Sequence, residues 1–438
     1  MKEYRRVFAE VATVGGPVLL DEAFGTLIGA GLIALINGLG PGCLAEYTVA
    51  GLIQLTLIGI IGSIGTGAAV LVARAVGAGD WQRARAAAGS VLLASFALGI
   101  GLTIIGWHCG EKIFQMVNGG GMYAGTIRQL SHVFWLALPL LLTMQVGRSI
   151  MQGMGATGDA FRLSAFYATA GLGLGSAFAA LWPGLGILAV AWAMGLSAMA
   201  GFVFCLLLLG RHAGMRFSWR CLFAGDLGLV RSLCRLSAPV FVEQSFMQVG
   251  YALFILILVD VGVEGFAAHQ IAQQLEGASL SVGSCLAVAT LALVGKALGQ
   301  NAPGRARRYT RFILGLTLVS MTVCGLGMLF FAEAAVGVFT KDTAVKAWAV
   351  GCVSLALLEQ PTLAVTFILG NALRAAGDTK WPMLGTVAGM WLVRLPLCLF
   401  LIGKLGYGIT MAWAITATDY FVRSIILILR YRARRPAA

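Results

Sequence analysis

Five acidic residues fall inside long apolar stretches of the sequence, where an ionised side chain is costly to keep. They are Asp21, Glu22, Glu243, Glu276 and Glu359. On membrane-insertion scales a charged residue near the centre of a helix costs roughly 2.5 to 3.5 kcal/mol, so a residue kept there usually has a function. A carboxyl group in apolar surroundings can take up and release a proton or hold a cation. We therefore treat these five residues as candidate sites for H⁺ or Na⁺ inside a membrane.

An internal repeat relates several of these residues. The sequence of one segment recurs at a constant offset of 222 (239 − 17) without a gap, and the two copies are residues 17–96 and 239–318. At this offset Asp21 corresponds to Glu243, and Gln54 corresponds to Glu276. Repeats of this length in a membrane protein point first to a secondary transporter.

The two acids of the second copy are the leading proton-binding pair. Carboxylates held close together in a medium of low dielectric favour binding a proton between them, so we select Glu243 and Glu276, with Glu359 as the third candidate. Adjacent helical residues point about 100° apart, so only one of Asp21 and Glu22 can face a given direction. A structural role, in which a carboxylate pairs with an arginine or with backbone freed by a nearby proline, stays open for Asp21, Glu22 and Glu243.

Further polar and aromatic residues could line a binding cavity. Met247, Tyr251 and Phe254 follow Glu243 at intervals of three to four residues and form one stripe of a helix. Methionine and aromatic side chains make adaptable walls that suit amphiphilic cations. Packing inside a helical lobe is the alternative for each of them. The candidate cavity residues are Gln54, Met247, Gln248, Tyr251, Gln270 and Gln274.

Arg394 and Asp419 are expected to form a buried structural pair. They fall in consecutive apolar stretches that run in opposite directions. Each lies about 12 residues, or about 18 Å, from the start of its stretch. The two charges therefore reach a similar depth and can neutralise each other.

The elements that must position these residues are membrane-spanning helices. Apolar residues make up 59% of the 438 residues and charged residues 11%, and the mean hydropathy is +0.88. This composition excludes a water-soluble globule with a charged surface. A stretch of about 20 apolar residues is long enough to cross a bilayer. We expect an all-α integral membrane protein with twelve spans, at residues 14–36, 48–72, 87–108, 129–152, 161–182, 185–209, 236–259, 266–294, 311–332, 347–370, 382–403 and 407–430.

The twelve spans divide into two lobes. Six spans fall in each copy, so the copies share one orientation and are related by a pseudo-twofold axis along the membrane normal. We expect residues 1–210 to form the N-terminal lobe, 211–235 a cytoplasmic connector and 236–438 the C-terminal lobe. Most of the 31 Lys and Arg residues fall on the side of the N-terminus, which predicts that both termini are cytoplasmic. The net charge of +13 then reflects topology and contact with anionic lipid, so a nucleic-acid partner is not needed.

Other functional classes lack the motifs that they require. There is no GxxxxGK[ST] motif for ATP, the nine cysteines form no CxxC pair, and the four histidines form no HExxH. We expect no enzyme activity, no metal site and no cofactor. The sequence predicts a multi-pass protein of the cell (inner or plasma) membrane.

Several short motifs resemble those of one transporter family. They are VGKALG at residues 294–299, AAHQIA at 267–272, LRAAGDT at 373–379, MWLVRLP at 390–396 and VARAVGAGD at 72–80. Together with the duplicated six-span plan, they resemble bacterial members of the multidrug and toxic compound extrusion (MATE) family. This family lies within the wider multidrug/oligosaccharidyl-lipid/polysaccharide exporter superfamily.

The resemblance implies two six-helix lobes around a central cavity and alternating access by rocking of one lobe against the other. A small organic compound would leave the cell in exchange for inward H⁺ or Na⁺. We expect amphiphilic organic cations as substrates, membrane lipids as surroundings and a monomeric protein. Two coupling positions of the family are apolar in this sequence. Residues 29–34 lack the acid of the first helix, and Met247 stands near the place of the glutamate of the seventh.

Two other interpretations stay open. A flippase for a lipid-linked or cell-envelope intermediate would have the same fold, but it would need a basic cavity. Apart from Arg148 and Arg394 the predicted spans are poor in positive charge. A membrane enzyme or scaffold would need a catalytic constellation or an extramembrane domain, and neither is evident in the sequence.

Overall fold

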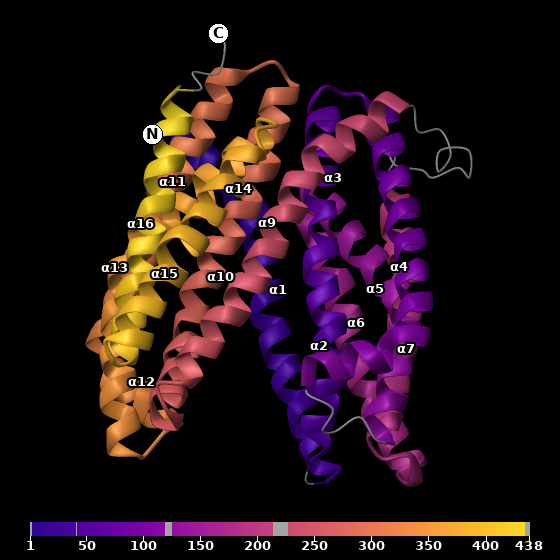
Figure 1. The fold of residues 1–438 in the computed structure, drawn as a ribbon. Coiled ribbons are helices and arrows are strands. Elements are labelled where there is room, and N and C mark those ends of the chain that lie inside the picture. The colour runs from indigo at the N-terminus through magenta and orange to yellow at the C-terminus, as the bar shows by residue number, and fades with distance from the viewer. Residues whose placement is uncertain (1, 41, 119–124, 213–226, 434–438) are drawn as a thin grey trace. The chain divides into compact units, whose positions relative to one another are not determined.

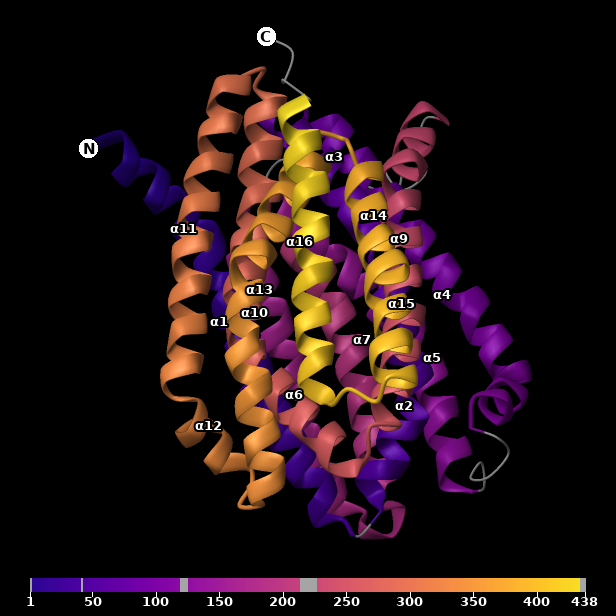
Figure 2. The ribbon, with the colours of Figure 1, turned by 60° about the vertical axis from the view of Figure 1, so that its left-hand side comes forward.

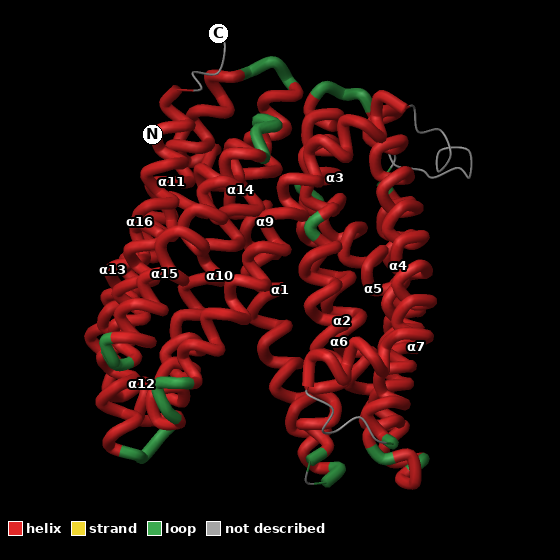
Figure 3. Tube along the Cα trace, viewed as in Figure 1, coloured by secondary structure: helices red, strands yellow, loops and turns green. Residues whose placement is uncertain are grey.

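The computed structural model describes residues 2–40, 42–118, 125–212 and 227–433, which are helical almost throughout (Figure 1). Within these segments there is no strand, and loops are confined to short connections between helices (Figure 3). The all-α prediction is therefore confirmed. The expected connector falls partly outside this description, because residues 213–226 are not among the described segments.

The chain forms two compact units, here called the N-terminal and C-terminal units. The N-terminal unit is Pro17–Ser237, and the C-terminal unit is Ala238–Ala438 together with Met1–Gly16. The N-terminal unit contains most of α1 (Lys2–Gly38), then α2 (Cys43–Gly62), α3 (Ile64–Gly77), α4 (Trp81–Asn118), α5 (Thr126–Met154), α6 (Thr157–Leu181), the 3₁₀ turn η1 (Pro183–Leu185) and α7 (Ile187–Arg211).

The C-terminal unit follows the same plan with two additions. Most of α9 (Leu227–Val259) leads to α10 (Val263–Gly299), α11 (Pro303–Phe330), the short α12 (Ala332–Phe339) and α13 (Thr343–Ala375). The next span combines α14 (Lys380–Val387), the π-helical η3 (Ala388–Arg394), α15 (Leu395–Cys398) and the π-helical η4 (Leu399–Lys404), and the last helix is α16 (Ile409–Ala433). The short α12 and the π-helical segments were not expected from the sequence.

Twelve helical stretches of the described chain are long and apolar enough to cross a membrane. This number agrees with the sequence prediction, although most of the helices extend beyond the predicted spans. The repeat is visible in the helix boundaries, because α7 begins at Ile187 and α16 begins at Ile409, an offset of 222 (409 − 187). The helices interrupted by proline are also equivalent, with Pro139 in α5 and Pro361 in α13.

Helices α1 and α9 each change unit beside a proline. The boundaries fall between Gly16 and Pro17, and one residue before Pro239. The first 16 residues therefore belong to the C-terminal unit, whereas we expected them in the N-terminal lobe. The start of α1 lies along α11 (Figure 2): the ring centroids of Tyr4 and Phe312 are 6.1 Å apart, and Glu10 accepts a hydrogen bond from the Tyr309 hydroxyl.

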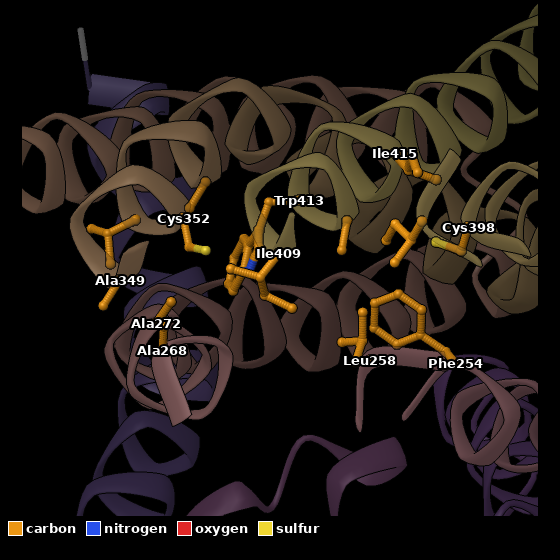
Figure 4. Packing of buried hydrophobic residues seen from close by; sticks show 14 of the residues in the cluster. Phe254, Leu258, Ala268, Ala272, Ala349, Cys352, Cys398, Ile409, Trp413 and Ile415 are labelled. Carbon is orange, nitrogen blue, oxygen red and sulfur yellow. The ribbon is translucent and has the colours of Figure 1, made fainter. Parts of the chain in front are cut away.

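Each unit has its own hydrophobic core. In the N-terminal unit buried side chains from α3 to α7 meet, including Val72, Leu92, Val146, Leu163 and Cys205. In the C-terminal unit the largest cluster joins α9, α10, α13 and α16 and includes Phe254, Ala272, Cys352, Ile409 and Trp413 (Figure 4). Burial of such side chains contributes about 1.5 to 3 kcal/mol for each large one. These cores fix the helices that hold the polar residues described next.

Candidate functional site

A carboxylate one helical turn after the unit's first proline is held by an arginine and a hydroxyl in the C-terminal unit. Arg374 Nη2 on α13 donates to both carboxylate oxygens of Glu243 on α9, at 2.7 and 2.8 Å. Thr386 Oγ1 on α14 donates to Glu243 Oε1 at 2.9 Å. The side chain of Glu243 is only 7% exposed and that of Arg374 15%, so this is a buried, fully paired carboxylate.

The N-terminal unit contains a related but more open cluster. Arg148 Nη1 on α5 lies 3.0 Å from Asp21 Oδ2 on α1, and Ser164 Oγ on α6 donates to the same oxygen at 3.4 Å. The side chain of Arg148 is 31% exposed. As in the other unit, the carboxylate is engaged by a cation, which is the structural role that the sequence left open.

The repeat relates the two clusters almost atom for atom. Asp21 and Glu243, and likewise Ser164 and Thr386, are separated by 222 positions (243 − 21; 386 − 164). The two arginines are not equivalent: 148 + 222 is position 370, which is Gly370, one helical turn before Arg374. The arginine of the C-terminal unit thus reaches a carboxylate that is longer by one methylene from one turn further along its helix.

A second, deeper cluster is centred on Asp419 of α16. Arg394 Nε, at the end of the π-helical η3, donates to Asp419 Oδ2 at 2.8 Å. Arg423 donates to both oxygens of the same carboxylate, at 2.5 and 2.6 Å. Asp419 is fully buried, and the two guanidinium groups also lie over the ring of Tyr420, at 5.2 and 5.0 Å from its centroid. The structure therefore brings Arg394 and Asp419 together, and it adds Arg423 as a second cation.

Next to this cluster lie two glutamates from different helices. Glu359 on α13 is fully buried, and Glu276 on α10 is 9% exposed. Their side chains are within hydrogen-bonding reach of each other, and both feel the charge of Arg394. Both oxygens of Glu359 are buried, and no side-chain or backbone donor in the described chain reaches them. Because a carboxylate has no donor of its own, a hydrogen bond between these two groups requires one proton on the pair.

The polar surroundings of the glutamate pair continue along α10 and α13. Gln360 lies within hydrogen-bonding reach of Glu276, and Ser279 Oγ donates to Gln360 Oε1 at 2.5 Å. Ser279 and Gln360 are both fully buried. The pair is thus fixed from one side by neutral groups and approached from the other by Arg394.

The N-terminal unit has no counterpart of this buried charge. The repeat positions of Glu359, Arg394 and Asp419 are Ala137, Leu172 and Ser197, each 222 residues earlier. Gln54, at the position equivalent to Glu276, is buried and donates to the carbonyl oxygen of Phe134 at 2.6 Å. The protonatable pair is therefore a property of the C-terminal unit alone, among the residues that the structure describes.

A cavity of about 370 Å³ opens beside both clusters within the C-terminal unit. Its wall includes Glu243 and Arg374 of the first cluster, and Tyr420 and Arg423 of the second. Met247 also faces it, and its sulfur lies 3.6 Å from Arg423 Nη1. Gln244, Ser284, Thr366 and Asn371 add neutral polar groups to the wall, and Leu363, Phe367 and Leu427 add apolar ones.

The structure distributes the predicted residues over different surroundings. It gives Glu243 and Glu276 different partners, although we expected the two as one pair, and it places Glu359 beside Glu276. Tyr251 packs against the hydrophobic core and receives a hydrogen bond from Gln273 at 2.5 Å. The remaining predicted residues do not line this cavity: Glu22, Gln270 and Gln274 are exposed, and Gln248 is half-buried.

Several residues of the site were not identified from the sequence. Thr386 could have been found, because Ser164 occupies its repeat position and both are hydroxyl residues. Arg374 was assigned to the helix end, and its reach to Glu243 depends on how α13 packs in the unit. Gln360 and Arg423 gave no sequence signal, since neither recurs in the other copy.

This arrangement can hold and release a proton but offers no reaction centre. The described residues contain no group of three or more His, Cys, Asp or Glu side chains that could hold a metal ion. The ionisable groups are paired with one another across helices, and the cavity beside them is large enough for a small organic molecule.

Comparison with known proteins identifies the family. The sequence matches the MatE family over residues 17–176 and 239–400, so that the two matches begin at Pro17 and Pro239. It is 20% identical over 436 residues to the uncharacterized transporter YisQ of Bacillus subtilis, covering 95% of this chain and 92% of that protein. It is 26% identical over 460 residues to a probable multidrug resistance protein NorM of Bradyrhizobium diazoefficiens, covering 98% and 94%.

Solved structures agree on the fold. A structure described as the outward-facing conformation of a multidrug resistance MATE family transporter is similar with a TM-score of 0.88 at 18% identity, covering 97% of this chain and 95% of that one. The family matches include most of the residues of both units that carry the polar clusters. The chain belongs to the MatE family, and it is a multi-pass membrane transporter rather than an enzyme.

Proposed function

We propose that this protein is a proton-coupled exporter of amphiphilic organic cations and that Glu276 and Glu359 carry the coupled proton. The observation that supports this most directly is the contact between the two buried glutamates. The probable multidrug resistance proteins among the relatives make export of organic compounds the natural class of activity.

Charge balance supports one proton per pair. The deep cluster contains the cations Arg394 and Arg423 and the anion Asp419, with Glu276 and Glu359 beside them. With one proton on the pair the five groups sum to zero, and without it they carry one negative charge. Uncompensated charge is costly in a buried setting. Loss of the proton therefore requires a compensating change, such as arrival of a cationic substrate or access of water.

The same cations favour H⁺ over Na⁺ as the coupling ion. A sodium ion needs several oxygen ligands and is repelled by a nearby guanidinium group. Arg394 lies close enough to the pair to interact with both carboxyl groups. A proton adds no separate cation to the site, because it is bound covalently to one oxygen. Proton coupling thus fits the electrostatics of this pair better.

The cavity in the C-terminal unit supports an amphiphilic cargo. Met247, Leu363 and Phe367 give it adaptable apolar walls, and Glu243 is its only acidic wall residue among the described residues. The alternative is an anionic or lipid-linked cargo, for which Arg374 and Arg423 on the wall would argue. One relative, 23% identical over 411 residues, is named as the FAD transporter of Shewanella oneidensis. Both arginines are already paired with carboxylates, which favours the cationic proposal.

The proposed setting is the inner or plasma membrane, with a monomeric protein whose termini are both cytoplasmic. The distribution of Lys and Arg residues along the sequence supports this orientation. The proton would then be taken up from the outside and released inside, while the substrate moves out.

Reconstituted liposomes with an imposed proton gradient test the proposal. Efflux of a lipophilic cation such as tetraphenylphosphonium should follow the proton gradient and should not respond to a sodium gradient. Glu359→Gln and Glu276→Gln should bind the cation but lose proton-driven transport, whereas the exposed Glu264→Gln should behave as the wild type. Proton-driven transport that is unchanged in both pair variants would refute the coupling site. A response to FAD but not to the cation would favour the alternative cargo.

A further inference from the structure

A second cavity lies at one end of the C-terminal unit, apart from the polar clusters. It is bounded by the first turns of α1, the last turns of α10 and the first turns of α11, and its volume is about 370 Å³. A neighbouring cavity of about 380 Å³ shares Arg6, Glu10, Arg305 and Tyr309 with it. This is the end at which the N-terminus lies, and by the proposed topology it faces the cytoplasm.

Arg305 is held in a fixed orientation between these two cavities. Its Nε donates to the Tyr309 hydroxyl at 3.1 Å, its Nη1 donates to Gln300 Oε1 at 3.4 Å, and its Nη2 lies 3.5 Å from Glu10 Oε1. The Tyr309 hydroxyl in turn donates to Glu10. Tyr309 is only 4% exposed, whereas the side chain of Arg305 remains 43% exposed. The guanidinium is thus oriented by buried groups and still accessible from outside.

Positive charge dominates the lining of this pair of cavities. Arg6, Lys296, Arg305 and Arg308 contribute four cations, and Glu10 is the single carboxylate among the described lining residues. Lys296 is exposed, and none of the described residues forms an ion pair with it. The deeper wall is apolar and includes Val14, Leu293 and Ala297. The site therefore offers a cationic mouth above an aliphatic floor.

The repeat supplies an internal comparison. Subtracting 222 from Tyr309, Gln300 and adding 222 to Glu10 gives Ala87, Ala78 and Ser232. The basic residues themselves do recur, because Arg305 corresponds to Arg83 and Lys296 to Arg74. Basic residues at this depth are expected in both copies from topology alone. The tyrosine, glutamine and glutamate that orient Arg305 are present only in the C-terminal unit, which topology does not explain.

We propose that this cavity binds a phosphate group, as carried by the headgroup of an anionic phospholipid. Basic pockets between helices at the cytoplasmic side of a membrane are suited to such headgroups, and arginine matches the geometry of phosphate oxygens. The aliphatic floor suits the start of an acyl chain. A soluble phosphate compound shares the headgroup chemistry but gains nothing from the floor, so the two sources can be told apart.

The test is binding of defined probes to the full-length protein in detergent, measured by native mass spectrometry and by thermal shift. The probes are phosphatidylglycerol, phosphatidylcholine with the same acyl chains, glycerol 3-phosphate and inorganic phosphate. The test variant is Lys296→Gln/Arg305→Gln. The control is Arg83→Gln/Arg85→Gln, which removes two charges from the equivalent turn of the other copy. Lys296→Gln alone removes an exposed group and guards against a folding defect in the double variant.

We expect the wild type to bind phosphatidylglycerol in preference to phosphatidylcholine. At about one kcal/mol for each basic residue near the headgroup, the double variant should bind it on the order of 30-fold more weakly. Lys296→Gln should lose about 5-fold on the same basis, and the control should bind as the wild type does. Glycerol 3-phosphate bound as tightly as the lipid, with the same dependence on Lys296, would assign the site to a soluble phosphate.

Two results would overturn the proposal. One is equal retention of phosphatidylglycerol and phosphatidylcholine by the wild type, with no shift from either phosphate compound. The other is equal loss of binding in the test and control variants, which would indicate general attraction to basic residues. Neither result depends on transport, so the phosphate site can fail while the exporter proposal stands, and the reverse also holds.

Discussion

Ser164 and Thr386 occupy equivalent positions in the two copies of the repeat, and each donates a hydrogen bond to the carboxylate on the first helix of its own unit. Ser164 Oγ lies 3.4 Å from Asp21 Oδ2, and Thr386 Oγ1 lies 2.9 Å from Glu243 Oε1. Each carboxylate also has an arginine partner. The duplicated unit therefore contains a polar brace that joins its first, fourth and fifth spans, which makes this brace structural in both copies.

Removing the hydroxyl of the buried brace should destabilise the C-terminal unit. Thr386→Val keeps the shape of the side chain and leaves Glu243 Oε1 without one donor, so we expect a loss of about 1.5 to 3 kcal/mol. Thr386→Ser should restore most of it. Ser164→Ala in the more open cluster should have a smaller effect. Thermal unfolding in detergent measures all three, and equal stability of Thr386→Val and the wild type would contradict the brace.

Removing the arginine of the same brace should cost more. Arg374→Gln leaves the carboxylate of Glu243 buried without a cation, and loss of one partner of a buried pair typically costs about 3 to 5 kcal/mol. The double variant Glu243→Gln/Arg374→Gln removes the stranded charge and should recover more than half of the loss. Arg148→Gln should cost less, because its side chain is 31% exposed. A double variant as unstable as Arg374→Gln would show that charge is not the cause.

Asp419 should be the most sensitive acidic residue of the C-terminal unit. Asp419→Asn would leave Arg394 and Arg423 buried together without an anion, so a loss of at least about 3 to 5 kcal/mol is expected. Asp378→Asn is the matched control, because Asp378 pairs with Arg430, whose side chain is 33% exposed. It should lose about 1 kcal/mol or less. Comparable losses in the two variants, measured by chemical denaturation, would argue against a special role for the buried cluster.

The sequence predicted the elements better than it predicted their neighbours. The number of spans, their repeat register and the depth of Arg394 and Asp419 depend on apolar length and helical rise, which can be read along the chain. The contact of Glu276 with Glu359 depends on α10 packing beside α13, and a repeat offset relates equivalent positions without saying which helices touch. For that reason Glu276 was assigned to the wrong partner.

The placement of the first 16 residues has a similar cause. The repeat begins at Pro17, so the sequence marks a boundary there but does not say with which unit the preceding turns pack. Contacts such as that of Glu10 with Tyr309 decide it, and these involve a tyrosine that is absent from the other copy. The phosphate site proposed above was invisible in the sequence for the same reason.

The last prediction concerns the backbone beside Asp419. Gly389 lies in the π-helical η3, and a methyl group added to it would overlap the carboxylate of Asp419 and the guanidinium of Arg423. Both groups are buried and bonded to each other, so they can move only by breaking their pair. Gly389→Ala should therefore destabilise the protein by about as much as loss of a buried ion-pair partner, about 3 to 5 kcal/mol.

Gly403 provides the control, because it lies in the other π-helical segment of the same span and has no atom within 4 Å of an added methyl group. Gly403→Ala should be neutral or slightly stabilising, since alanine restricts the unfolded chain more than glycine does. If crowding at Asp419 is the cause, Gly389→Ala should also lose proton-driven transport in the fraction that remains folded, because Arg394 would no longer be held beside the glutamate pair. A Gly389→Ala protein with wild-type stability would show that the cluster has more room than its contacts indicate.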